Sequence, residues 1–539
     1  MNPLSVPRYR TEPRGRTVMS GIGPAVVEHY LAHPEAWPFD GATPVRLEET
    51  HSAWVLLGAT KVLKIKKPVN FGFLDFATLD RRRACCEAEV RLNRRFAPAL
   101  YEGVVTFTGG AKGLRCEPGV HSGDEYGVLM ARFPDAGQLD RRLAAGDLSL
   151  ADLSAFGQSW ARRQTEFARA EASSPFGSAA AVQKPVAANF FHLWPKVAYI
   201  NNGAARLTAL EAKSREEGAA LAPRFSRRLI EGFIREGHGD LHLKNLCLYQ
   251  ETIQAFDCID FSEQLRWIDT VSDLAFLFMD LTARSANPEA MALLNGWLTE
   301  SGDHEGLALL PYYFRYRALV RAKVAALDLA QATTAVAREA CIDRLEAQLS
   351  LAERPLFAPG LILMQGVSGS GKTHWSTRLA PQLGALHLRS DVERKRLLGL
   401  EATARPTSDQ DRAARYGAEM SRRTYERLNF LTRQHLLSGY RVLLDATFLN
   451  PEDLQAFQVL GQSIGVPTVI VHCTAPEAQL RERVHARSTV GTDASDADLY
   501  VLDAQLARGA GAPAGTSLTL TPQSDEVAVL EKLEALLAR

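Results

Sequence analysis

The sequence predicts an α+β bilobal domain followed by an α/β domain built on a parallel sheet. Three observations support this order. Short β-rich runs such as "AWVLLG" (53–58) and "KVLKIKK" (61–67) gather within residues 45–133. A mainly helical pattern follows over 136–355. From residue 361 onward, apolar strand segments alternate with helical ones, which is the pattern of a parallel sheet covered by helices.

The boundary between these parts is predicted at "LAERPLFAPG", residues 351–360. Two prolines and a glycine end a long helical stretch there, and the apolar run "LILMQGV" begins at once. A chain of 539 residues is also too long for one core. We therefore predict one domain over 40–355, with lobes at about 40–133 and 136–355, and a second domain over 356–539.

Composition and charge narrow the class of protein. The chain is 46% hydrophobic and 23% charged, and its 62 basic and 62 acidic residues cancel. A neutral chain disfavours tight nonspecific nucleic-acid binding, although a local basic groove stays open. The seven cysteines form no CxxC pair and are expected to be free thiols in a reducing compartment. No apolar run reaches the length of a membrane span, so we predict a cytoplasmic protein without a membrane partner.

The strongest motif is "GVSGSGKT" at 366–373, which fits G-x-x-x-x-G-K-[ST] between an apolar strand and a helical segment. Glycines allow the backbone to wrap around phosphate oxygens at the start of a helix. Lys372 is expected to reach the β- and γ-phosphates, and Thr373 to hold Mg²⁺. ATP and Mg²⁺ are therefore the predicted cofactors. The other predicted nucleotide-binding residues of this loop are Gly366, Ser368, Gly369, Ser370 and Gly371.

Two aspartates follow the next strands of the same domain. Asp391 comes just after "ALHLRS", where α/β sheets bind ligands, with the basic residues Arg389, Arg394 and Lys395 around it. It is expected either to accept a proton from an acceptor hydroxyl or to cap its helix, and both readings stay open. Asp445 ends the apolar strand "RVLLD" and is the predicted second residue of the magnesium site.

Two arginines of "QLRERVHARS" lie four residues apart, on one face of a predicted helix. Arg483 and Arg487 are predicted to close over the transferring phosphoryl group. A solvated basic helix is the alternative.

Residues 360–510 resemble small P-loop kinases of the zeta-toxin, gluconate-kinase and chloramphenicol-phosphotransferase group. "SDVERKRL" and "DATFLNPED" also resemble the kinase domain of phage polynucleotide kinase. The resemblance implies that Asp391 acts on the acceptor hydroxyl and that arginines of a lid stabilise the phosphates. Acceptors in this group vary from sugars to nucleic-acid ends. An acidic stretch, 492–505, resembles a segment of ATPase-like members, and the sequence suggests no role for it.

A second, unrelated motif lies in the first part. "HGDLHLKN" (238–245) has the spacing of a kinase catalytic loop, with Asp240 five residues before Asn245. Asp240 is expected to orient the acceptor hydroxyl and Asn245 to bind Mg²⁺. Asp260 in "CIDF" is the predicted further metal ligand. The alternative is a kinase-like domain that binds without catalysis.

The lysine that would anchor the nucleotide phosphates is ambiguous. Lys64 and Lys66 share one face of a predicted strand, and the "V-L-K" pattern favours Lys64. On the next helix Glu89 is preferred over Glu87 as its ion-pair partner. No glycine-rich loop precedes this strand, so residues 50–52 would have to cover the phosphates.

Together these motifs resemble aminoglycoside phosphotransferases over residues 40–330. The whole arrangement resembles bacterial proteins described as bifunctional aminoglycoside phosphotransferase/ATP-binding proteins. It implies a protein-kinase-like domain followed by a P-loop domain, in an ATP-dependent phosphotransferase with two nucleotide sites. Its acceptors would be small molecules with hydroxyl groups. A polycationic acceptor requires a pocket lined with carboxylates, and 265–330 offers few beyond Asp269, Asp273 and Asp280.

The sequence leaves two alternative functions open. One is a C-terminal kinase for the 5′-hydroxyl of a polynucleotide, which makes a nucleic-acid end a possible partner. The other is a P-loop domain that regulates a kinase-like or non-catalytic first domain. The acceptors, the choice of ATP over GTP and the oligomeric state do not follow from the sequence.

Overall fold

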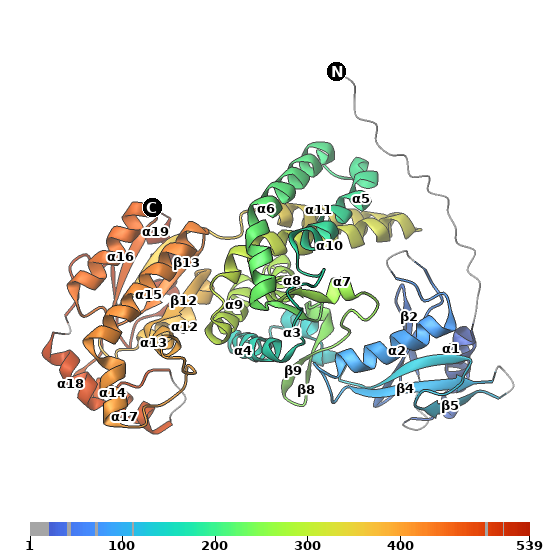
Figure 1. Cartoon of the computed structure of the whole chain (residues 1–539), viewed down its shortest axis with the longest axis horizontal. Coiled ribbons are helices and arrows are strands. Elements are labelled where there is room, and N and C mark those ends of the chain that lie inside the picture. The colour runs from blue at the N-terminus through green and yellow to red at the C-terminus, as the bar shows by residue number, and fades with distance from the viewer. Residues whose placement is uncertain are drawn as a thin grey trace, which may run out of the picture. The chain divides into compact units, whose positions relative to one another are not determined.

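The computed structural model describes residues 21–39, 45–70, 74–109, 113–490, 494–509 and 511–538 (Figure 1). Its chain forms two compact units. The first comprises Met1–Arg141, His238–Asp240 and Lys244–Arg266, and the second comprises Arg142–Gly237, Leu241–Leu243 and Trp267–Arg539. The predicted boundary near residue 356 lies inside the second unit and stays a prediction.

The first unit is built on an antiparallel sheet of order β1-β2-β3-β6-β4-β5. Helix α2 packs against β4 and β6, where Cys86 and Val90 join a core with Tyr126 and Val128. The Thr78 side chain caps the start of α2 by accepting a hydrogen bond from the Arg81 N–H. The elements of this sheet and its helices are α1 (Gly23–Ala32), β1 (Arg46–Glu49), β2 (Ala53–Leu57), β3 (Lys61–Lys66), α2 (Leu79–Asn93), β4 (Tyr101–Thr108), β5 (Arg115–Pro118) and β6 (Glu125–Ala131).

The catalytic-loop region of the first unit continues into a hairpin of β8 (Leu246–Tyr249) and β9 (Thr252–Ala255) and the short helix α7 (Glu263–Arg266). The hairpin turns at Gln250 and Glu251, both with positive φ, as tight hairpin turns require. This loop and hairpin interrupt the part of the chain that the sequence predicted to be mainly helical.

The second unit begins with a bundle of helices. Helices α4 and α9 approach closely at two glycines: a Cβ on Gly157 would lie 2.3 Å from the Leu293 carbonyl oxygen, and one on Gly296 would lie 2.1 Å from that of Ser154. The elements are α3 (Leu139–Ala145), α4 (Leu150–Glu166), α5 (Ala179–Leu193), α6 (Gly203–Glu231), β7 (Ile234–Glu236), β10 (Trp267–Asp269), α8 (Thr270–Ala283), α9 (Asn287–Ser301), α10 (Leu310–Gln331) and α11 (Ala335–Glu353).

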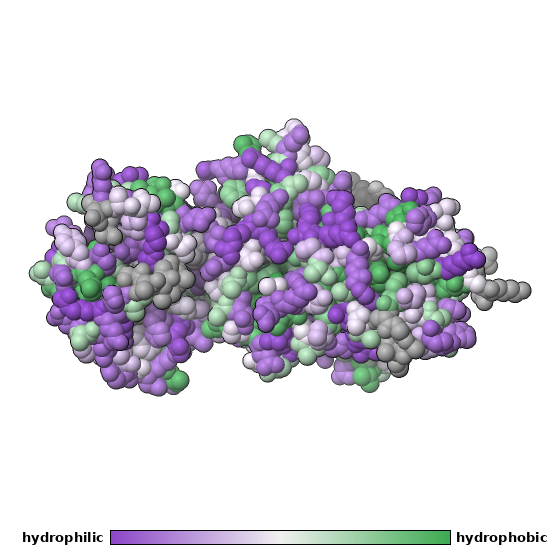
Figure 2. Space-filling view, turned by 90° about the horizontal axis from the view of Figure 1, so that it is seen from below, coloured by the Kyte–Doolittle hydropathy of each residue, from purple (hydrophilic) through white to green (hydrophobic). Residues whose placement is uncertain are grey.

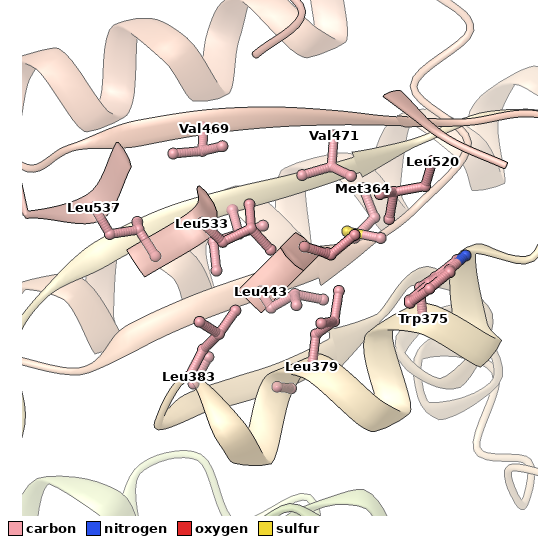
Figure 3. Packing of buried hydrophobic residues seen from close by; sticks show 14 of the residues in the cluster. Met364, Trp375, Leu379, Leu383, Leu443, Val469, Val471, Leu520, Leu533 and Leu537 are labelled. Carbon is pink, nitrogen blue, oxygen red and sulfur yellow. The ribbon is translucent and has the colours of Figure 1, made fainter. Parts of the chain in front are cut away.

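The second unit also contains a five-stranded sheet of order β12-β13-β11-β14-β15, in which every neighbouring pair is parallel. Helices α12 and α19 cover one face, where Leu379 and Leu533 meet Met364 and Leu443 (Figure 3). Helices α15 and α16 contact strands of the same sheet. This parallel sheet and the antiparallel sheet of the first unit confirm the predicted order of fold classes.

The strands and helices of this part are β11 (Gly360–Gln365), α12 (Lys372–Gln382), β12 (Ala385–Arg389), α13 (Ser390–Leu397), α14 (Asp409–Tyr416), α15 (Ala418–Leu437), β13 (Arg441–Asp445), α16 (Pro451–Ile464), β14 (Thr468–Cys473), α17 (Glu477–Val490), α18 (Leu499–Ala507), β15 (Leu518–Leu520) and α19 (Glu526–Leu537).

The face of the molecule in Figure 2 is mostly hydrophilic, with hydrophobic residues scattered over it. Within the described ranges, no helix combines the length and the apolar composition that a bilayer crossing needs. All seven cysteines are free thiols, as predicted from their spacing.

Candidate active sites

The phosphate-binding motif forms a tight loop between β11 and α12. Gly366, Gly369 and Gly371 have φ values of 147°, 80° and 96°, in the region that favours glycine. A Cβ on Gly369 would lie 2.8 Å from the Leu480 carbonyl oxygen, so a side chain there would force the neighbouring backbone to move. Helix α12 begins directly after the loop, at Lys372, and its first N–H groups therefore adjoin the loop.

The side chains of the loop fit a nucleotide phosphate and a magnesium ion. Thr373 Oγ1 donates a hydrogen bond to Asp445 Oδ2 at 2.6 Å, which joins the two predicted metal-side residues. Lys372 is buried, and its Nζ donates to the Val367 carbonyl at 2.9 Å. Ser370 Oγ is buried and has no hydrogen-bond partner among the described residues. A buried donor left open beside a lysine and a Thr–Asp pair is suited to a bound phosphate.

Asp445 is held as a carboxylate by its surroundings. Burial acts to raise its pKa, but the neighbouring His387 and the charges of Arg389 and Lys372 outweigh burial and keep the pKa well below its ordinary value. His387 Nε2 lies 3.6 Å and Arg389 Nε 3.9 Å from Asp445 Oδ2. Burial lowers the pKa of His387, an effect that Asp445 opposes. An ionised Asp445 is the state that a magnesium ligand needs.

Strand order brings the predicted C-terminal residues to one edge of the sheet. Parallel strands β12 and β13 place Arg389 opposite Asp445, and β13 also pairs with β11, which leads into the phosphate loop. Asp391 lies in the first turn of α13, just after β12. The N-cap position is Arg389 and no side chain caps α13, so the capping role considered for Asp391 is not seen.

Of the three cations expected around Asp391, Arg394 contacts it in an ion pair. The Arg394 guanidinium also lies over the Tyr416 ring, 4.7 Å from its centroid. Arg389 lies beside Asp445 instead, and Lys395 Nζ bonds Asp496 at 3.0 Å. The candidate acceptor carboxylate is therefore oriented by one arginine from its own helix.

Helix α17 brings one predicted arginine to the loop. Arg483 Nη1 donates to the Gly369 carbonyl at 3.2 Å, and its side chain is exposed. Arg487 belongs to α17, but its side chain lies outside the described residues. A contact that sequence analysis missed comes from α18, where Gln505 Oε1 accepts a hydrogen bond from the Ser368 N–H at 2.7 Å.

The catalytic-loop motif of the first unit brings Asp240 and Asn245 together, as their spacing predicts. Asn245 Nδ2 donates to Asp240 Oδ2 and to the Asp240 carbonyl, both at 3.0 Å. Gly239 has φ 82°, and a Cβ there would lie 2.6 Å from the Leu265 carbonyl oxygen. His238 Nε2 lies 2.9 Å from the carbonyl oxygen of Phe256, which directly follows β9, so the loop contacts the end of the hairpin.

Both candidate lysines meet Glu89. Lys64 Nζ lies 2.9 Å from Glu89 Oε1 and 2.5 Å from Asp257 Oδ1. Lys66 Nζ lies 2.6 Å from Glu89 Oε2 and forms a second ion pair with Asp260. Glu87, the alternative partner, is instead half exposed and pairs with Arg83. Lys66 and Asp257 are thus additional members of the site, and only the alternation of the strand pointed to Lys66.

The charges of this cluster are strongly coupled. Burial acts to raise the pKa of Glu89, but Lys64 and Lys66 outweigh it and lower the pKa to about 2. Burial raises the pKa of Asp260, an effect that Glu89 increases and Lys66 opposes. Asp257 has a φ of 58°, an uncommon backbone geometry for a residue with a side chain. A carboxylate must be ionised to bind Mg²⁺, and the carboxylate of Asp260 is paired with Lys66 here.

Two of the three aspartates that the sequence singled out in 265–330 accept hydrogen bonds within the helical part. Asp269 accepts from Arg228 Nε at 2.6 Å, and Asp280 accepts from the Leu243 N–H at 3.0 Å. Asp273 is buried, with its Oδ2 close to Gly237. Two of these aspartates therefore hold hydrogen bonds within the helical part, and the third is buried.

Comparisons with known proteins found matches to a family model, to relatives in other bacteria and to solved structures. Residues 361–511 match the family model described as an AAA domain. The chain is 28% identical over 461 residues to an uncharacterised protein of Mycobacterium tuberculosis and to one of Mycobacterium bovis, covering 86% of this chain and 90% of each relative.

Solved structures resemble separate parts of the chain. A choline/ethanolamine kinase family protein from Mesorhizobium loti is 13% identical and covers 61% of this chain and 95% of its own, with a TM-score of 0.36. The ADP-bound aminoglycoside phosphotransferase APH(2'')-Ib is also 13% identical, covering 61% and 97%, with a TM-score of 0.34. The Mycobacterium tuberculosis APS kinase CysC is 21% identical, covering 34% and 99%, with a TM-score of 0.23.

The chain therefore joins an antiparallel sheet with a catalytic-loop motif to a parallel sheet with a phosphate loop. The first unit has the antiparallel sheet, buried lysine–glutamate pair and catalytic loop of the aminoglycoside-phosphotransferase-like type. The second unit has the parallel sheet and phosphate loop of P-loop kinases.

Proposed function

We propose that the protein is a cytoplasmic ATP-dependent phosphotransferase with two nucleotide sites, which transfers the γ-phosphoryl group to hydroxyl groups of small-molecule acceptors. One observation carries the proposal for the C-terminal site. Strands β11, β12 and β13 bring the phosphate loop, Asp391 and the Thr373–Asp445 pair to one sheet edge. A phosphate cradle, a magnesium pair and a candidate acceptor base are the parts that phosphoryl transfer requires.

In the C-terminal site, bound MgATP supplies the phosphoryl group. Lys372 neutralises charge on the phosphates, and Thr373 and Asp445 hold the metal ion. Asp391 orients the acceptor hydroxyl and takes its proton, while Arg394 holds the carboxylate of Asp391 in place. Arg483, which reaches the loop from α17, stabilises the charge that develops on the phosphoryl oxygens.

In the first unit, Asp240 has the same role toward its own acceptor. Asn245 and Asp260 provide oxygen ligands for Mg²⁺, and Lys64 anchors the phosphates while Glu89 holds the lysine. The sequence offers few carboxylates over 265–330 for a polycationic acceptor. We therefore propose an uncharged or anionic small molecule for this site.

The test is phosphoryl transfer from ATP labelled at its γ-phosphate, with wild type, Asp240→Asn and Lys372→Ala. The acceptor panel contains aminoglycosides, sugars, nucleosides, UDP-sugars and 5′-hydroxyl oligonucleotides. Each variant is expected to lose one labelled product by about 100-fold or more, because each removes a group that acts in the transition state. Asp147→Asn and Lys532→Ala, at exposed positions, are the matched controls and should retain both products.

The outcomes separate the candidate functions. A labelled oligonucleotide lost with Lys372→Ala would replace the small-molecule proposal at the C-terminal site by a polynucleotide kinase. Hydrolysis of ATP that Lys372→Ala abolishes, with no labelled acceptor, would contradict the two-kinase proposal.

The second candidate function is a P-loop domain that regulates the first domain, and one contact favours it. Asn295 of α9 bonds the backbone of β12 at two points, so the helical part and the nucleotide-binding sheet share an interface. Under this function, Lys372→Ala would change the rate of the product that depends on Asp240.

A further inference from the structure

The acidic segment, defined here as residues 494–507, is anchored at its start beneath α13. The Asp496 side chain is 2% exposed. It bonds Lys395 Nζ at 3.0 Å, Arg415 Nη1 at 3.3 Å and Arg405 Nη1 at 3.4 Å. Lys395 lies on α13, which also carries Asp391. A buried carboxylate shared by three cations is costly to move, so this end of the segment is fixed to the acceptor side of the site.

The other end of the segment is fixed to the phosphate loop. Helix α18 begins after Asp498, whose side chain accepts from the Val501 N–H at 2.9 Å. Leu502 is fully buried in a cluster with Val367 of the loop and with Leu480 and Val484 of α17. The contact of Leu502 with Val367, one turn before Gln505, therefore fixes how α18 lies against the phosphate loop.

Gln505 meets the loop through one end of its carboxamide. Its Oε1 accepts from the Ser368 N–H at 2.7 Å. A carboxamide also has two N–H donors on its Nε2, and no hydrogen bond from this nitrogen is found among the described residues. The contact through Oε1 thus holds the side chain against the loop and leaves Nε2 as a neutral donor beside a site that binds phosphate.

We infer that Gln505 is a phosphate-binding residue of the C-terminal nucleotide site, donating from Nε2 to the terminal phosphate of the bound nucleotide, and that Asp496 is a positioning residue that holds the acidic segment for this contact. The inference rests on the proposed function, because it assumes that the loop binds a nucleotide. It assigns a role to the segment for which the sequence suggested none. It also gives a physical link between the phosphate loop and α13.

The decisive variant is Gln505→Glu, because it keeps the size of the side chain and an oxygen that accepts from Ser368. If Gln505 only braces the loop, this variant keeps its hydrogen bond, and its added charge weakens Mg·ADP and Mg·AMP-PNP to a similar degree. If Nε2 donates to the terminal phosphate, the second carboxylate oxygen of Gln505→Glu faces that phosphate. The affinity for Mg·AMP-PNP, measured by titration calorimetry, is then expected to fall about tenfold or more. Ala504→Glu adds the same charge at the exposed neighbouring position and should bind like wild type.

A second variant keeps the test valid if the new charge disturbs folding. Gln505→Ala adds no charge, and it is expected to weaken Mg·AMP-PNP more than Mg·ADP, because only the former carries the terminal phosphate. Equal weakening of both nucleotides would contradict the contact with the terminal phosphate. Thermal unfolding of each variant verifies that the fold is retained.

Hydrogen exchange measures the role of Asp496 without any enzymatic assay. Mg·AMP-PNP is expected to slow exchange over 494–507 in wild type and in Asp503→Asn, whose residue is exposed on the same helix. In Asp496→Asn this protection should be lost, although the loop still binds the nucleotide. Protection that persists in Asp496→Asn would overturn the positioning role.

Nucleotide binding and the role of Gln505 can be tested separately. Wild-type protein that does not bind Mg·AMP-PNP would overturn the C-terminal nucleotide site and the inference together. Wild-type protein that binds, with Gln505→Glu and Ala504→Glu binding equally well, would overturn the inference alone.

Discussion

His435 belongs to a chain of buried polar side chains in the second unit. His304 Nδ1 lies 3.0 Å from His435 Nε2, and His304 Nε2 lies 3.1 Å from Glu393 Oε1. Arg396 also pairs with Glu393, and Arg427 Nε lies 3.4 Å from Glu393 Oε2. Burial lowers the pKa of His435 to about 3, with His304 and Arg427 adding to the effect and Glu393 opposing it.

This depressed pKa predicts that the second unit loses stability as the pH falls below about 6.5, the ordinary value for histidine. Below pH 6.5, His435 binds a proton in the unfolded chain but not in the folded one. The loss of folding stability therefore continues until the pH reaches the folded pKa of about 3. The free energy of unfolding should be lower by about 1.4 kcal/mol at pH 5.5 than at pH 7.5 from this residue alone.

Urea unfolding of wild type and His435→Gln at the two pH values measures this contribution. The variant should show the smaller difference between pH 5.5 and pH 7.5. His304, Arg396 and Arg427 outweigh burial and lower the pKa of Glu393 from its ordinary 4.5 to about 2. Glu393 therefore loses its contribution to folding stability only below about pH 4.5, outside the range compared here. Equal pH dependence in both proteins would show that His435 titrates normally in the folded state.

At the scale of elements, helix α9 completes the edge of the parallel sheet. Asn295 Nδ2 donates to the Ala385 carbonyl, and Asn295 Oδ1 accepts from the His387 N–H, both at 2.9 Å. Strand β12 is the edge strand, so these two bonds satisfy backbone groups that would otherwise lack a partner there. The same strand carries His387 and Arg389, which set the charge of Asp445.

Asn295→Ala is therefore expected to lower the free energy of unfolding by about 2 kcal/mol or more, because it leaves two buried backbone groups unpaired. It should also weaken Mg·AMP-PNP binding, since β12 holds the neighbours of Asp445. Asn287→Ala, at the exposed start of α9, is the matched control. Urea unfolding and calorimetric titration measure the two effects. A variant as stable as the control would show that the contact at the sheet edge contributes little.

At the scale of the whole molecule, the helical part and the parallel sheet are joined within one unit. Tyr440 OH donates to the Leu307 carbonyl at 2.7 Å, and Arg396 Nη2 donates to that of Thr299 at 2.8 Å. Helix α9 packs against α12, the helix that follows the phosphate loop. These buried contacts cross the predicted domain boundary near residue 356.

We predict that the second unit unfolds in one transition. Hydrogen exchange at increasing urea should give the same midpoint for α9 and for β14, although the two elements are far apart in the sequence. Mg·AMP-PNP should raise both midpoints equally, because a ligand stabilises the whole cooperative unit that binds it. Separate midpoints, with only β14 shifted by the nucleotide, would indicate two independently folding parts.

The sequence by itself determined the two fold classes, the phosphate loop and the Asp240–Asn245 pair. Each of these depends on periodicity or on spacing within about ten residues, which the local backbone converts directly into geometry. The roles of the individual site residues remain predictions.

Only the tertiary structure decided which distant side chains meet. It brought Lys66 to Asp260, 194 residues away, and the Ser368 N–H to Gln505, 137 residues away. It also brought Lys395 to Asp496, 101 residues away. Such contacts depend on how helices and strands pack, because packing places side chains by shape and burial, and no short stretch of sequence contains that information.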